Sequence, residues 1–192
     1  MAGDPAAWRV KGVAIKATLS FIRENHGEPA EAEVLAALPP GIAKQLGKQV
    51  LVSSWYPGQV FVELTRVADH HLRYSGSFAS TVGEASADYA LGESGPYSIF
   101  RHKGLRHGVG RFLESGAGLW ELYYDVGSFG VQKTSPGKVQ VGIQQGHLFH
   151  PTVLDRVAAF VKRGIELIGA QQVRVHWIQI ADGVRMDVEW KE

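Results

Sequence analysis

The sequence predicts an α+β domain in which a layer of N-terminal helices packs on a C-terminal antiparallel sheet, with one long helix before the terminal hairpin. Apolar residues recur at helical spacing upstream of residue 118, and their period changes to two downstream of it. Asp182-Gly183 stands between two alternating runs near the C-terminus, which is typical of a tight hairpin. Helices followed by strands favour α+β over a parallel sheet. We expect a single domain over residues 1–192, with a mainly helical part at 1–117 and a sheet-and-helix part at 118–192.

The first part is expected to consist of helices. Apolar positions three and four residues apart place them at about 10–22, 28–38, 60–72, 78–91 and 97–113. Asn25-His26-Gly27 separates the first helix from the second, which begins near Glu28-Pro29 because proline is tolerated in a first turn. The second helix ends before Pro39-Pro40. Gly104 and Gly108 each cost about 1 kcal/mol inside a helix and therefore oppose the fifth one.

The second part is expected to hold strands at 120–126, 131–133, 138–143, 173–180 and 184–190, and a helix at 151–168. The longer runs alternate between apolar and polar residues, so each strand has one apolar face. Ser135-Pro136-Gly137 supplies turn residues between the second strand and the third. The helix has an apolar stripe, and Gly169 fits its C-terminal cap. The residues of the last strand expected to face the core are Val184, Met186, Val188 and Trp190.

Composition limits the classes of function. The 192 residues contain no cysteine, which excludes a disulfide framework, cysteine-ligated zinc, an iron–sulfur cluster and a thiol nucleophile. Lys and Arg number 20 against 19 Asp and Glu, so the formal charge of +1 gives no strong field to attract nucleic acid or an acidic membrane. No apolar run approaches the roughly 20 residues that span a bilayer, and the first residues lack the features of a signal peptide. We therefore expect a cytoplasmic protein with no membrane or nucleic-acid partner.

Several short motifs resemble those of a family of uncharacterised bacterial proteins. They are Val10-Lys11-Gly12, Leu38-Pro39-Pro40, Ser53-Ser54-Trp55-Tyr56-Pro57, Gly83-Glu84 with Ala87-Asp88-Tyr89, and Asp187-Val188-Glu189-Trp190. The wider order of elements resembles the fold shared by haem nitric-oxide/oxygen-binding (H-NOX) domains, vinyl-reductase-type ligand-sensing domains and transport-particle subunits. This resemblance implies a pocket between helices and sheet that senses a ligand, holds an acyl chain or docks a partner. A fold resemblance does not by itself fix a function.

The resemblance implies a ligand site under the helices, and the candidate residues are Tyr97, His102, His107 and Trp120. The alternative is that the aromatic side chains only fill the core. Haem is the sharpest ligand hypothesis, because His107 stands about where the H-NOX proximal histidine belongs, with His102 as the second choice. H-NOX domains also have a Tyr-x-Ser-x-Arg run before the long helix, where this chain reads Gly142-Ile143-Gln144-Gln145-Gly146-His147. Without haem, the two histidines belong to the polar face of a basic helix.

A cluster of positive residues surrounds those histidines. Arg101, Lys103, Arg106 and Arg111 have no acidic residue among them, and the next acid along the chain is Glu114. Such a patch could bind an anionic partner, because the arginine fork donates two hydrogen bonds to one phosphate. The alternative is an ordinary solvated helix face.

A metal site is a weaker hypothesis. His147 and His150 precede the long helix, and His176 on a later strand could approach them. Three imidazoles would make a zinc shell with an open position. However, no carboxylate is paired with them in the sequence, and histidines near a helix start are common structural residues.

These observations favour a non-catalytic, cytoplasmic signalling or adaptor domain that binds a small molecule or a protein partner and needs no cofactor. The sequence contains no phosphate-binding loop, zinc-protease motif or nucleophile elbow, so no catalytic residue is assigned. Two alternatives stay open, namely a haem-based gas sensor with a histidine axial ligand and an uncharacterised enzyme. The oligomeric state is also open, with a homodimer among the alternatives.

Overall fold

The computed structural model describes the chain except for residues 1–3, 5, 75, 104 and 192, and it describes residues 103, 105–107, 133 and 134 by their backbone alone. The N-terminal elements are β1 (Arg9–Lys11), α1 (Gly12–Ala36), α2 (Pro40–Leu46), β2 (Trp55–Pro57), α3 (Gly58–Leu72), α4 (Phe78–Leu91), the 3-10 helix η1 (Ser98–Lys103) and α5 (Leu105–Tyr123). The C-terminal elements are β3 (Ser128–Ser135), β4 (Lys138–Gln144), the 3-10 helix η2 (Gly146–Leu148), α6 (Pro151–Leu167), β5 (Gln171–Ile180) and β6 (Gly183–Lys191).

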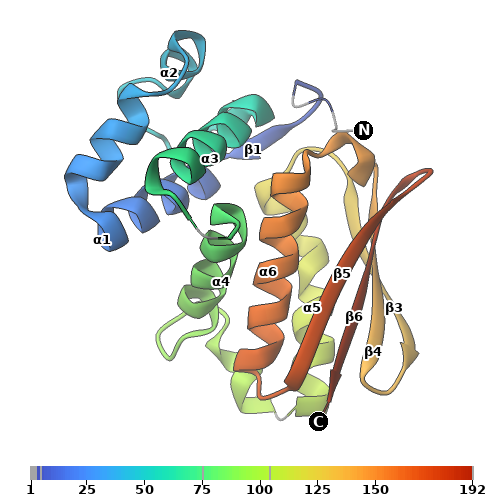
Figure 1. Ribbon diagram of the computed structural model, residues 1–192. Coiled ribbons are helices and arrows are strands. Elements are labelled where there is room, and N and C mark those ends of the chain that lie inside the picture. The colour runs from blue at the N-terminus through green and yellow to red at the C-terminus, as the bar shows by residue number, and fades with distance from the viewer. Residues whose placement is uncertain (1–3, 5, 75, 104, 192) are drawn as a thin grey trace.

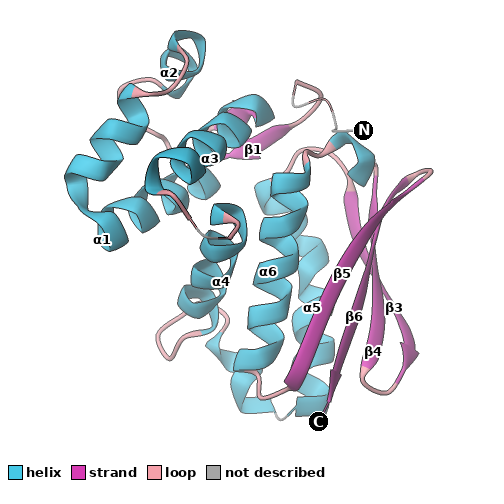
Figure 2. Cartoon of the chain, in the orientation of Figure 1, coloured by secondary structure: helices cyan, strands magenta, loops and turns pink. Residues whose placement is uncertain are grey.

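The larger sheet has four strands in the order β3-β4-β6-β5, and each neighbouring pair is antiparallel. Helices α5 and α6 lie against the sheet, with α5 beside β3 and α6 beside β5 (Figure 1). Helix α4 packs on α6, and α1, α2 and α3 form a second group of helices with the short β1–β2 pair (Figures 1 and 2). The predicted α+β fold with a C-terminal antiparallel sheet is confirmed, and α6 is the predicted long helix before the terminal hairpin.

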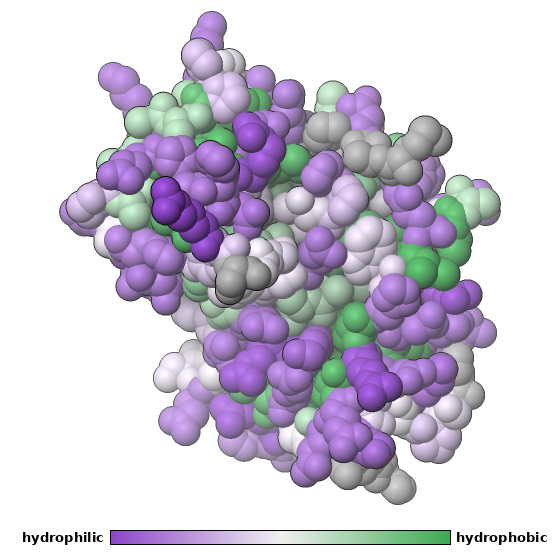
Figure 3. All heavy atoms as spheres, in the orientation of Figure 1, coloured by the Kyte–Doolittle hydropathy of each residue, from purple (hydrophilic) through white to green (hydrophobic). Residues whose placement is uncertain are grey.

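Polar and charged side chains cover most of the face seen in Figure 3, where apolar side chains show only in small areas between them. The apolar residues gather instead in a core to which both groups of helices and the sheet contribute. Within the described chain, no helix combines the length and the apolar character that crossing a bilayer requires.

Helix α1 consists of two helical segments joined at Gly27. This residue has a φ of 85° and a ψ of 166°, outside the helical region, and Pro29 lies in the first turn of the second segment. Arg23 and Glu31 form an ion pair across the break, with 2.6 Å between Nε and Oε2. The predicted separation of two helices at Asn25-His26-Gly27 is therefore confirmed.

The prediction of a strand over 120–126 is wrong, because α5 continues to Tyr123. Trp120 and Tyr124 are both buried, but Leu122 between them is 60% exposed. A half-buried strand would bury all three on one face, whereas a helix brings positions four apart together and turns the middle one outward. The predicted boundary near residue 118 consequently falls inside α5, and the predicted helix over 97–113 is divided between η1 and α5.

The terminal hairpin forms as predicted, with its turn one residue earlier. Ile180 pairs with Gly183, so the turn residues are Ala181 and Asp182. Gly183 lies so close to β4 that a Cβ there would be 2.1 Å from the carbonyl oxygen of Ile143. The inner face of β6 is also as predicted, since Val184, Met186 and Val188 are fully buried and Trp190 is half-buried.

An aromatic cluster joins the N-terminal segment to the C-terminal half. Trp8 precedes β1, Trp120 belongs to the last turn of α5, Tyr124 directly follows α5, and Phe149 precedes α6. The ring centroids are 4.9 Å apart for Trp8 and Phe149, 4.5 Å for Trp120 and Tyr124, and 5.2 Å for Tyr124 and Phe149. Burial in this cluster raises the pKa of Tyr124 to about 12.

Helices α4 and α6 approach each other closely at Gly83. A Cβ at this position would lie 2.3 Å from the carbonyl oxygen of Arg156 and 3.1 Å from the Cβ of Ala159. Because the nearest atom belongs to the backbone of α6, the two helices would have to separate to accept a side chain.

The close approach predicts that Gly83→Ala lowers the free energy of unfolding by about 1–3 kcal/mol, since overpacking forces α4 away from α6. Gly118→Ala in α5 is the matched control, because no described atom outside the local backbone lies within 4 Å of the added Cβ. The control should raise stability by about 0.5–1 kcal/mol, as alanine does in an exposed helix interior. Urea unfolding measures both changes. An unchanged midpoint for Gly83→Ala would contradict the described packing.

The burial of Tyr124 predicts a specific loss of stability in alkali. The unfolded chain releases the tyrosine proton near pH 10 and the folded chain near pH 12, so stability falls as the pH rises through this window and levels off above it. The fall due to this residue should total about 2–3 kcal/mol. Tyr124→Phe should flatten the pH dependence between pH 10 and 12, as measured by urea midpoints. Parallel curves for the two proteins would show that this hydroxyl is not the cause.

Candidate functional site

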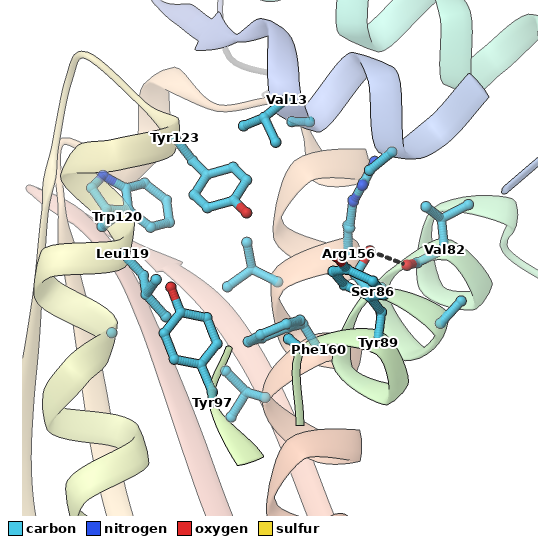
Figure 4. A pocket seen from close by; sticks show the side chains of 18 of the residues that line it. Val13, Val82, Ser86, Tyr89, Tyr97, Leu119, Trp120, Tyr123, Arg156 and Phe160 are labelled. Carbon is cyan, nitrogen blue, oxygen red and sulfur yellow. Dashed lines mark hydrogen bonds between the residues drawn. The ribbon is translucent and has the colours of Figure 1, made fainter. Parts of the chain in front are cut away.

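A cavity of about 540 Å³ lies between α1, α4, α5, α6 and β3 (Figure 4). Most of its lining is aliphatic or aromatic, and the residues that carry the argument below are Val13, Ala17, Tyr97, Trp120, Tyr123, Arg156, Val157 and Phe160. Its volume is within the range of about 300–1,000 Å³ found for small-molecule sites. The cavity therefore has the size and the apolar character of a ligand site.

One face of the first segment of α1 forms a wall of the cavity. Its lining positions are Val13, Ala14, Lys16, Ala17, Ser20, Phe21 and Glu24, which follow the helical period of three and four residues. Lys16 and Glu24 are exposed, and so is Tyr89 on α4, with 79% of its surface accessible. The cavity thus reaches the surface between α1 and α4.

The opposite wall comes from α5 and β3 and is held in place by close packing. The indole Nε1 of Trp120 donates a hydrogen bond of 2.9 Å to the carbonyl oxygen of Val126, which fixes the ring at the end of the helix. Gly116 leaves room for the ring of Phe129, since a Cβ there would lie 2.5 Å from that ring.

Two tyrosines supply polar atoms inside the apolar lining. In Figure 4 the hydroxyls of Tyr97 and Tyr123 point into the cavity. Tyr97 is stacked on Phe100, with 6.2 Å between the ring centroids. Burial raises the pKa of Tyr123, so its phenol is neutral at physiological pH.

Arg156 places a buried positive charge in the wall formed by α6. The residue is 9% exposed, and its Nη1 donates a hydrogen bond of 2.7 Å to Oγ1 of Thr18 on α1. The guanidinium carbon lies 5.1 Å from the ring centroid of Phe61. Burial lowers the pKa of Arg156, although an arginine stays charged at physiological pH. Among the described residues, no carboxylate forms an ion pair with it and Thr18 is its one hydrogen-bond partner.

The predicted ligand residues separate into two groups. Tyr97 and Trp120 both line the cavity, and their role in binding a ligand stays a prediction. His102 is exposed in η1 and is not part of the lining. His107 belongs to α5, but its side chain lies outside the described part of the structure.

The position of residue 107 can nevertheless be compared with the cavity-facing side of α5. At about 100° per residue, position 107 is about 140° around the helix from Phe112 and about 180° from Gly116. Phe112 and Gly116 are both part of the lining. Position 107 is thus on a different side of α5 from the positions that line the cavity.

The predicted anionic-partner patch is described only in part. Arg101 in η1 and Arg111 in α5 are exposed, which suits either a binding surface or a solvated face. The side chains of Lys103 and Arg106 lie outside the described part of the structure. A binding role for this patch therefore stays a prediction.

The three histidines considered for a metal have separate structural settings. His147 is exposed in η2, and His176 is exposed on β5, opposite Asp187 of β6. His150 caps α6, because its side chain accepts a hydrogen bond of 3.3 Å from the backbone N–H of Thr152. No group of three His, Asp or Glu side chains suited to a metal occurs in the part of the chain that is described.

Sequence reasoning missed Arg156, the most unusual residue of the lining. It stands three residues after Val153 and four before Phe160, within the apolar stripe of α6. An arginine within an apolar stripe is a signal that the sequence does contain. Thr18 has no comparable signal, because its role depends on α1 meeting α6.

Comparison with known proteins identifies the architecture. No protein-family model and no curated protein matches the sequence. Among solved structures, the chain is similar to an unliganded Fe(II) H-NOX variant from K. algicida, with 12% identity, a TM-score of 0.69 and coverage of 95% of this chain and 97% of that one.

Two further H-NOX structures give the same result. A variant from T. tengcongensis has 9% identity and a TM-score of 0.68, and the match covers 95% of this chain and 98% of that one. The Fe(II)NO form from S. oneidensis has 8% identity and a TM-score of 0.69, with coverage of 95% and 99%. The described chain, with its helices α1–α6 and its antiparallel sheet, therefore has an H-NOX-like fold.

Proposed function

We propose that this chain is a ligand-binding sensory domain that holds an apolar small molecule in the cavity between α1, α4, α5 and α6. The observation that carries the proposal is the cavity itself, whose lining is mostly aliphatic and aromatic and whose volume is about 540 Å³. The H-NOX-like fold supports a sensory role, because the similar structures include a protein solved with NO bound to its iron.

The position of the cavity supports sensing rather than simple storage. Its walls belong to different groups of elements, since Val13 and Ala17 come from α1 whereas Trp120 and Val157 come from α5 and α6. A molecule in contact with both walls stabilises one packing of α1 against the rest of the domain. A ligand shifts a conformational equilibrium by its difference in affinity for the two states, and this contact provides such a difference.

Haem is the second candidate, because the similar structures include iron-bound H-NOX proteins. Haem iron in proteins is held by histidine, cysteine, methionine or tyrosine. The described lining contains no histidine and no methionine. The hydroxyls of Tyr97 and Tyr123 both point into the cavity, and burial raises the pKa of Tyr123 and so disfavours the phenolate that would bind iron. The described lining therefore does not fit a histidine-ligated haem, and our proposal is a ligand other than haem.

Binding of the neutral fluorophore N-phenylnaphthylamine tests the proposed function. The wild-type protein should bind one molecule of the probe, and the fluorescence of the bound probe should increase. The probe should also quench tryptophan emission, because Trp120 lines the cavity. Val157→Phe should weaken binding at least about tenfold, since the larger side chain occupies the cavity. The control is Val52→Phe, at an exposed position outside the lining. Equal binding by all three proteins would place the probe elsewhere and contradict the proposal.

Absorption spectroscopy after addition of ferric haem distinguishes the two candidates. We expect free haem to remain spectrally unchanged when mixed with the protein, because the described lining offers no imidazole. A one-to-one complex with a sharp Soret band that is lost in His107→Ala or His102→Ala would instead favour the haem sensor. Arg111→Ala, at an exposed position of α5, is the control for non-specific effects of altering this region.

A further inference from the structure

The buried guanidinium of Arg156 carries a charge that no described side chain of the protein neutralises. The side chain is 9% exposed, and no described carboxylate pairs with it. Burial of a charge without a partner of opposite sign is unfavourable, because the hydration lost is not replaced. The hydrogen bond to Thr18 and the ring of Phe61 compensate for part of this loss. Neither of these groups carries a negative charge.

The guanidinium also borders the cavity. Arg156 is part of the lining, and Figure 4 shows its nitrogen atoms at the end of the cavity next to α1. One N–H of Nη1 is donated to Thr18, so the second N–H of Nη1 and the N–H groups of Nε and Nη2 are the donors that remain. Beyond the guanidinium the lining is largely apolar, with Val157 and Phe160 following on the same helix.

From this juxtaposition we infer that the cavity selects ligands with a single carboxylate on an apolar body, and that Arg156 is the residue that pairs with the carboxylate. The inference rests on the proposed function, since it names the chemical class of the ligand. A carboxylate accepts the two parallel hydrogen bonds that a guanidinium donates.

Charge balance favours a carboxylate over a phosphate. One carboxylate neutralises one buried guanidinium, whereas a phosphate monoester would leave an excess negative charge in an apolar site. The other cation of the lining is Lys16, which is exposed where the cavity reaches the surface. An exposed ammonium is hydrated and contributes little to a buried ion pair.

The same arrangement connects the ligand to α1. Thr18 accepts the hydrogen bond of Arg156 and donates its own hydroxyl, at 3.0 Å, to the carbonyl oxygen of Ala14. A carboxylate held by Arg156 would therefore lie at the contact between α6 and α1. The carboxylate of the ligand would thus be recognised where the two groups of helices meet. The proposed sensing depends on this same contact.

Isothermal titration with three ligands that share one alkyl chain tests the assignment. The ligands are decanoate, decanol and decyl phosphate, each below its aggregation concentration. For wild type we expect decanoate to bind more tightly than decanol and decyl phosphate. Arg156→Met should weaken decanoate binding by about 10- to 150-fold, as the loss of charged hydrogen bonds does, and leave decanol binding unchanged. Arg163→Met is the matched control, because Arg163 is also on α6 but pairs with Asp88.

The melting temperatures of wild type and Arg156→Met without ligand show whether weaker binding by the variant is caused by a folding defect. If Arg156 serves the ligand, Arg156→Met should melt at the same temperature as wild type or a few degrees higher, because the buried charge is removed. A melting temperature several degrees lower would show a structural role and overturn the assignment. Decanoate should raise the melting temperature of wild type and of Arg163→Met, but not that of Arg156→Met.

The outcomes separate the head-group assignment from the proposed function. If wild type binds none of the three ligands and does not bind N-phenylnaphthylamine, both fail. If decanol and decanoate bind wild type and Arg156→Met equally, the apolar cavity is supported and the role of Arg156 is overturned. Tighter binding of decyl phosphate than of decanoate would also overturn the choice of a carboxylate.

Discussion

A positive charge buried with no described carboxylate beside it is the constraint on which the proposed ligand site depends. Arg156 reaches from α6 to Thr18 on α1, over the ring of Phe61 and beside an apolar cavity. An apolar residue of similar volume would fill this place with no loss of hydration. The arginine is therefore poorly explained by the stability of the described fold and well explained by an anionic group that enters the cavity.

The cavity exists because some helices approach each other closely and others do not. Gly83 brings α4 onto the backbone of α6, and Gly164 brings α6 onto the ring of Phe112 in α5. The first segment of α1 stands apart from α5, and the space between them is the cavity. The H-NOX-like fold supplies this frame, but the side chains that line it decide the chemistry, as is general for folds that serve several functions.

Much of the architecture was predictable because it depends on local patterns. The break in α1 follows from Gly27, and the terminal hairpin follows from alternating residues around Asp182-Gly183. The end of α5 was not predictable by the same method, since Trp120, Leu122 and Tyr124 alternate like a strand. In the structure α5 continues to Tyr123, and two of these three side chains are buried while the third is exposed.

The site was less predictable than the fold because it depends on contacts between distant segments. Tyr97 and Trp120, which were candidate ligand residues, line the cavity, whereas His102 is exposed and is not part of the lining. Arg156 was overlooked because a charge within an apolar stripe has no evident partner in sequence, and Thr18 lies 138 residues away from it. Recognising the site required both helices to be seen together.

The most direct test of the central claim is an experimental structure of the protein crystallised with decanoate. The account predicts electron density for the alkyl chain in the cavity between α1, α5 and α6, with the carboxylate within about 3 Å of the guanidinium of Arg156. A structure in which the cavity has collapsed, or in which Arg156 pairs with a carboxylate of the protein itself, would contradict it.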